Sequence, residues 1–77
     1  MINKNLKFEY GLLDELKKRS ISTTYIRQNK LISESTLQNI RMGKGITLNS
    51  LMAFADLMNM SLYEVIRYVK VVDNDNN

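Results

Sequence analysis

The apolar residues of this chain recur in a pattern that marks the starts of helices. At four places an apolar residue precedes a serine or threonine, and a second apolar residue follows five positions after the first. The four instances are Ile21-Ser22 with Ile26, Ile32-Ser33 with Leu37, Ile46-Thr47 with Leu51, and Met60-Ser61 with Val65. This pattern is the hydrophobic staple around a helix N-cap. The hydroxyl accepts a hydrogen bond from a free backbone N–H of the first turn, and the two apolar residues pack against each other across that turn. The pattern predicts helix starts near residues 22, 33, 47 and 61.

The spacing of apolar positions extends these starts and adds an opening helix. The predicted helices span residues 8–19, 23–29, 34–42, 48–58 and 62–72, with Phe8, Leu12, Leu13 and Leu16 on one stripe of the first and Leu48, Leu51, Met52, Ala55 and Met58 on one stripe of the fourth. Gly43-Lys44-Gly45 is expected to end the third helix, because glycine readily takes the left-handed conformation. At the end of the fifth, Val69, Val71 and Val72 also suit an extended segment. The fold expected is all-α, a compact five-helix bundle.

Composition narrows the class of protein. The 77 residues, 44% of them hydrophobic, predict one small domain over residues 1–72 and a disordered polar tail over 73–77. No apolar run is long enough to span a membrane, and the start lacks the features of a secretory signal, so a cytoplasmic domain is expected. Cysteine and histidine are both absent, which excludes disulfides, Cys/His zinc sites and His-based catalysis. We therefore expect no enzyme, no catalytic residue, no metal and no cofactor.

Positive charge is concentrated in the middle of the chain. Residues 17–44 carry a net charge of +6, whereas residues 1–16 carry −1 and residues 45–77 carry −2, which together give the overall +3. Such a field attracts a polyanion and raises the rate of encounter with it. A solvated basic face without a partner is the alternative interpretation of the same charges.

The second and third predicted helices are short and are joined by only about four residues, 29–32, so they must cross at a steep angle. This is the arrangement of a helix-turn-helix, which presents its second helix to the DNA major groove. If Leu37 and Ile40 face inward, the opposite face carries polar side chains, namely Glu34, Ser35, Gln38 and Asn39. Asparagine and glutamine can bond an adenine edge, serine can meet several bases, and glutamate can accept from cytosine.

In these residues the chain resembles the Cro/phage-repressor-like helix-turn-helix family, also called Xre-type regulators. The resemblance covers about residues 8–68. It rests on the string Ile32-Ser33-Glu34-Ser35-Thr36-Leu37-Gln38-Asn39-Ile40, then Gly43-Lys44, Ile46-Thr47-Leu48-Asn49-Ser50-Leu51 and Ala55-Asp56-Leu57-Met58-Asn59-Met60-Ser61-Leu62. The resemblance implies that Thr23, Ser33, Lys44 and Asn49 contact DNA phosphates and that Glu34, Ser35, Gln38 and Asn39 read bases.

Two positions depart from the family pattern. Arg27 stands where the family usually has a small residue, and Leu31 stands where the turn usually has glycine. Arg27 can extend its apolar stem over the helix contact and reach either Glu34 or a phosphate, so it joins the candidate phosphate contacts. A leucine at positive φ would be strained, so the turn is expected to reshape around Asn29 or Lys30.

The function predicted is sequence-specific binding of double-stranded DNA by a transcriptional regulator, a repressor of the phage or mobile-element type, with helix 34–42 in the major groove. One domain reads few base pairs, so a homodimer on a palindrome is expected, with Tyr63, Tyr68 and Val72 as the candidate dimer surface. The alternative is a protein-interaction module on the same scaffold, such as an antitoxin or a phage-encoded inhibitor.

Overall fold

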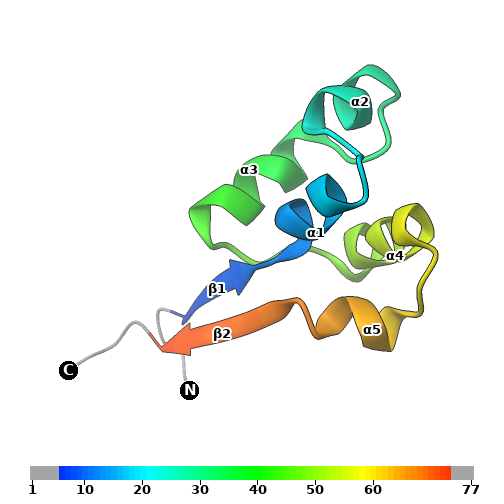
Figure 1. The fold of residues 1–77 in the computed structure, drawn as a ribbon. Helices are drawn as coiled ribbons and strands as arrows, with labels where there is room; N and C mark the ends of the chain where they lie inside the picture. The colour runs from blue at the N-terminus through cyan, green and yellow to red at the C-terminus, as the bar shows by residue number, and fades with distance from the viewer. Residues whose placement is uncertain (1–5, 74–77) are drawn as a thin grey trace.

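A computed structural model of the chain describes residues 6–73. Five helices separate two strands along the chain, and the strands, which come from the two ends of the described range, pair with each other at one end of the molecule (Figure 1). In chain order the elements are β1 (Leu6–Tyr10), α1 (Leu12–Lys18), α2 (Thr23–Gln28), α3 (Glu34–Met42), α4 (Leu48–Met58), α5 (Leu62–Ile66) and β2 (Val69–Asp73). Within residues 6–73, no helix is long and apolar enough to cross a bilayer.

Each of the four predicted helix starts carries the hydroxyl cap that the sequence pattern indicates. The capping residue is extended, and its side-chain oxygen accepts a hydrogen bond from the backbone N–H three residues later. The pairs are Ser22 with Tyr25, Ser33 with Thr36, Thr47 with Ser50, and Ser61 with Glu64, at 3.1 to 3.2 Å. Helices α2 to α5 therefore begin where the capping hydroxyls predict.

Two turns adopt the left-handed conformation at the expected places. Gly43 ends α3 with φ of 75°, which confirms the prediction that the Gly43-Lys44-Gly45 segment stops this helix. In the turn after α2, Lys30 takes the positive φ of 52°. The turn is thus reshaped around Lys30, and Leu31 avoids the strain that a positive φ would impose on it.

The outer ends of the predicted bundle differ from the expectation of an all-α fold. The first helix begins at Leu12 rather than at residue 8, and the fifth ends at Ile66 rather than at residue 72. Residues Leu6–Tyr10 and Val69–Asp73 instead form an antiparallel pair, with Phe8 opposite Val71 and Tyr10 opposite Val69. Aromatic and β-branched residues favour this pleated pairing. Five helices are confirmed in this range, but a small two-stranded sheet accompanies them. Of the predicted disordered tail, Asp73 ends β2 and residues 74–77 lie outside the described residues.

The core lies where the five helices meet. Its largest fully buried side chains come from α1, α2, α3, α4 and α5, and they are Leu12, Leu16, Ile26, Leu37, Phe54 and Val65. The predicted stripe on α4 is only partly correct. Ala55 and Met58 are buried, but Leu48 and Met52 are exposed, because α4 turns Phe54 inward instead.

Four hydroxyl groups connect the start of α3 to the start of α4. The cap Ser33 donates to Thr36 Oγ1 at 2.8 Å, and Thr36 Oγ1 lies 3.2 Å from Ser50 Oγ. Ser50 Oγ in turn accepts from the cap Thr47 at 3.0 Å. Thr36 is the one buried polar residue of the described range, so its hydroxyl is the central member of this chain. A buried hydroxyl without partners is costly, and here the Thr36 hydroxyl has two partners within the protein, Ser33 and Ser50.

Thr36→Val is expected to lower the free energy of unfolding by about 1–2 kcal/mol, because it leaves the hydroxyls of Ser33 and Ser50 without their shared partner. Chemical denaturation followed by circular dichroism measures the change. The matched control is Thr24→Val, since Thr24 is an exposed threonine on α2. An equal effect of the two substitutions would show that the hydroxyl chain contributes nothing to stability.

Candidate nucleic-acid interface

Helices α2 and α3 form a helix-turn-helix joined by residues 29–33. The turn is fixed from within, since the Leu31 N–H donates to the carbonyl of Ile26 at 3.0 Å and Ile32 is buried beside Ile26 in the core. Figure 1 shows the two helices running in different directions on either side of this turn. The short turn, anchored by the buried Ile32, therefore fixes the direction of α3 relative to α2.

One face of α3 is fixed in the core and the opposite face is open. Thr36, Leu37 and Ile40 are buried, at positions that follow the helical repeat. On the other side Glu34, Ser35 and Gln38 are exposed, whereas Asn39 is half-buried. The structure thus brings the four predicted base-reading residues onto the helix side that faces away from the core, and it leaves Gln38 the most accessible amide among them.

The N-terminal end of α3 carries an ion pair between the two helices. Arg27 Nε lies 2.8 and 2.9 Å from the two carboxylate oxygens of Glu34. Glu34, one of the two partners that the sequence allows for Arg27, is in contact with it. Both side chains are exposed, so the pair contributes little to stability. Its effect is electrostatic, because the arginine offsets a carboxylate that would repel DNA phosphates.

The other predicted phosphate contacts lie at helix ends. Thr23 is the first residue of α2, Ser33 caps α3, and Asn49 is exposed in the first turn of α4. The bond between Thr36 and Ser50 brings the starts of α3 and α4 together, so Ser33 and Asn49 are near one another. Because the Ser33 hydroxyl donates to Thr36, a phosphate at Ser33 would meet the backbone N–H groups of the first turn.

Lys44 lies at the opposite end of α3, in a loop held by β1. The loop is bonded at three points: Lys44 N–H donates to Asn39 O at 2.8 Å, Phe8 N–H donates to Gly43 O at 2.9 Å, and the Tyr10 hydroxyl donates to Lys44 O at 2.7 Å. Burial raises the pKa of the Tyr10 hydroxyl above its ordinary value. The exposed side chain of Lys44 therefore projects from a fixed backbone.

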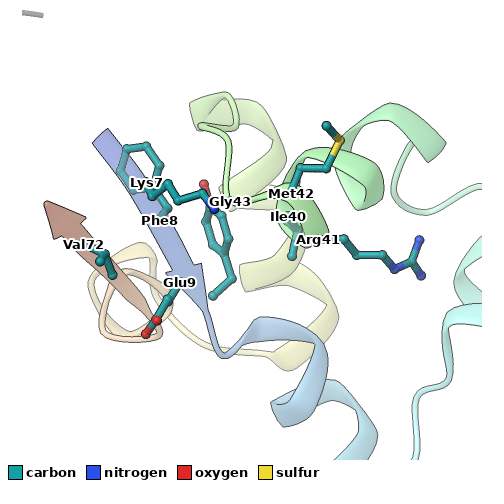
Figure 2. Close-up of a pocket in the computed structure, with 9 residues that line it drawn as sticks. Lys7, Phe8, Glu9, Ile40, Arg41, Met42, Gly43 and Val72 are labelled. Carbon is teal, nitrogen blue, oxygen red and sulfur yellow. The ribbon is translucent and has the colours of Figure 1, made fainter. Parts of the chain in front are cut away.

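A second cation, Lys7, accompanies Lys44, and sequence reasoning did not identify it. The pocket between β1 and the end of α3 is lined by Lys7, Ile40 and Gly43, and Figure 2 shows Lys7 reaching across it toward Gly43. A Cβ atom at Gly43 would stand 3.6 Å from Lys7 Cε. The local sequence around Lys7 does not predict this contact, because β1 and the end of α3 are far apart in the chain and meet only in the folded protein.

A scan against protein-family models identifies residues 12–70 as a Cro/C1-type HTH DNA-binding domain. The chain belongs to this family. The resemblance in its helix-turn-helix motif is thereby confirmed, and DNA is the partner of the Cro/C1-type domain. The match begins at α1 and ends within β2, so β1 lies before it.

A solved structure supports the fold of this Cro/C1-type domain. The crystal structure of the transcriptional regulator VanUg superimposes with a TM-score of 0.69 over 96% of each chain, at 16% sequence identity. At that identity the likeness concerns the fold. It extends beyond residues 12–70 to nearly the whole chain. No curated protein matches the sequence.

Gly43 is the residue through which β1 holds the end of α3, so its substitution tests this contact. Gly43→Ala is expected to lower the free energy of unfolding by about 1–2 kcal/mol, because alanine is strained at positive φ. In addition its Cβ would stand 3.1 Å from the Phe8 carbonyl oxygen. Thermal unfolding measures the effect. Gly45→Ala is the control, since a Cβ there meets only Phe8 Cε2 at 3.6 Å. Equal losses would contradict this role of Gly43.

Proposed function

We propose that this chain is a sequence-specific transcriptional regulator that inserts α3 into the major groove of double-stranded DNA. The observation that carries the proposal is the division of α3 into a buried apolar face and an outward face with Ser35, Gln38 and Asn39. An amide can exchange two hydrogen bonds with the edge of adenine, and a helix fixed from behind holds that amide in one place. Glu34, beside them, would accept from cytosine.

The cations and helix ends around α3 support the proposal that these groups bind phosphates while the outward face of α3 reads bases. Thr23, Arg27, Ser33 and Asn49 lie at or near the starts of helices, and Lys44 lies beyond the end of α3. Contacts on both sides of the reading face would fix the orientation of α3 on the duplex without reading sequence. Arg27 would bind through its terminal nitrogens while Nε stays on Glu34.

We further propose that the regulator is a repressor of the phage or mobile-element type that acts as a homodimer. One such domain reads only a few base pairs, so two copies on a palindrome, with half-sites roughly 34 Å apart, would supply useful specificity. Occupancy of the operator would then be sufficient to block transcription, with no catalytic step.

Substitution of the outward amides tests base reading. Gln38→Ala and Asn39→Ala are each expected to weaken binding to the best site, obtained by selection from random DNA, by about 1–3 kcal/mol. Titration by fluorescence anisotropy measures this, and unfolding curves verify that the fold is intact. Gln28→Ala, an exposed amide on α2, is the control. Unchanged binding by both variants would contradict the assignment, and a failure of the wild type to select any site would overturn the function itself.

Lys44 is expected to behave differently, as a contact to phosphate. Lys44→Ala should lower affinity for all sequences alike and reduce the slope of log affinity against log salt by about 0.9, because one fewer counterion is released. Arg67→Ala removes a charge beyond α5 and serves as the control. A changed base preference with an unaltered salt slope would exclude the phosphate role.

A further inference from the structure

The outward face of α3 ends in an apolar side chain to which the proposed function gives no role. Met42, in the last turn of the helix, is 46% exposed. It follows Ser35 and Gln38 at intervals of three and four residues, so the three side chains lie in one row along the helix. Figure 2 shows Met42 leaving α3 in the direction opposite to Ile40, which belongs to the buried face. Met42 is therefore a member of the face that the proposed function turns toward DNA.

The core of the protein does not account for Met42. Met58 is buried in the core and Met60 packs against it, which is the ordinary use of a flexible methionine side chain. Met42 lies on the other side of α3 from Leu37 and Ile40, the apolar residues that hold this helix. Because nearly half of its surface is in water, Met42 stabilises the fold little, whereas a ligand that covered it would gain the burial of that apolar area.

The neighbouring cations distinguish Met42 from a phosphate contact. Met42 borders the pocket that Lys7 lines, and Lys44 follows it by two residues. These two lysines supply the ammonium groups that a phosphate attracts, whereas a thioether has neither a hydrogen-bond donor nor a charge. Among the groups that base pairs present in the major groove, the 5-methyl group of thymine is the one that apolar side chains contact.

We propose that Met42 contacts the 5-methyl group of a thymine and thereby adds this base to the sequence that α3 reads. The proposal rests on the proposed function, because it requires α3 to lie in the major groove. The methionine side chain is unbranched and has three rotatable bonds, so it can pack against a methyl group without the strict geometry that an amide needs at a base edge.

The position of the thymine in the binding site follows from the helical repeat. Met42 lies one turn beyond Gln38, which is about 6 Å further along the helix axis. Successive base pairs are about 3.4 Å apart along the duplex. The thymine is therefore expected within about two base pairs of the pair that Gln38 contacts, on either strand.

Removal of single methyl groups from the DNA tests the contact without altering the protein. In the site selected from random DNA, each thymine is replaced in turn by deoxyuridine, which keeps the hydrogen-bonding groups and loses only the 5-methyl group. Fluorescence anisotropy measures binding of the wild type, which is expected to weaken about fourfold at a position within this range, the loss that corresponds to one buried methyl group. Equal affinity for all the uracil-containing sites, or a loss confined to thymines outside this range, would overturn the proposal.

Substitution of Met42 shows whether this side chain makes the contact. Met42→Ala is expected to bind the thymine site at least about fourfold more weakly than the wild type, and to bind the thymine and uracil sites equally. Met52→Ala is the matched control, because Met52 on α4 is 50% exposed, and this variant should discriminate as the wild type does. Discrimination that persists in Met42→Ala, or that is lost in Met52→Ala, would contradict the assignment to Met42.

Failure of the proposed function would give a different result from failure of this contact. A wild type that selects no DNA site overturns both. A wild type that selects a site, and binds it more weakly after Gln38→Ala, but binds thymine and uracil equally at every position, overturns only the contact of Met42 with thymine.

Discussion

The position of the candidate reading helix depends on a chain of hydroxyl groups centred on the buried Thr36. Ser33, Thr36, Ser50 and Thr47 join the caps of α3 and α4, so the starts of the two helices are fixed to each other by side chains that the sequence places three residues apart. Their hydroxyls bond one another, and each cap accepts from one first-turn amide, Thr36 N–H in α3 and Ser50 N–H in α4. No side-chain polar atom is buried without a partner in the described range. Leu37 and Ile40 complete the attachment by packing α3 onto the core.

Because α3 is attached along one face, its other face is available for a ligand without any rearrangement. The groups at the two ends of α3 are held in different ways. Near the start of α3, Arg27 binds Glu34 and the Ser33 hydroxyl accepts from Thr36 N–H, while the amides of Glu34 and Ser35 remain available. At its end, three hydrogen bonds fix the loop backbone while the side chain of Lys44 is exposed. A helix held at both ends in this way presents its outward side chains in a defined geometry.

Local chemistry was readable from the sequence, whereas contacts between distant segments were not. A cap and its staple involve six consecutive residues, so four helix starts and the stop at Gly43 follow from short strings. The strands lie at opposite ends of the described range, and Phe8 fits a helical spacing within its own segment, so its pairing with Val71 is not visible from local sequence. The contacts of Lys7 with Gly43 and of Thr36 with Ser50 likewise arise only once α3 meets β1 and α4. The outward residues of α3 were predictable because the helical repeat determines them once Leu37 and Ile40 are buried.

The small sheet supports the loop that follows α3. A lone two-stranded ribbon is marginally stable in water, and here β1 is held by β2 on one side and by Gly43 on the other. β1 also holds the loop that carries Lys44 at the end of α3, because the Tyr10 hydroxyl donates to the Lys44 carbonyl. Loss of the pairing between β1 and β2 would therefore also loosen the loop that follows α3.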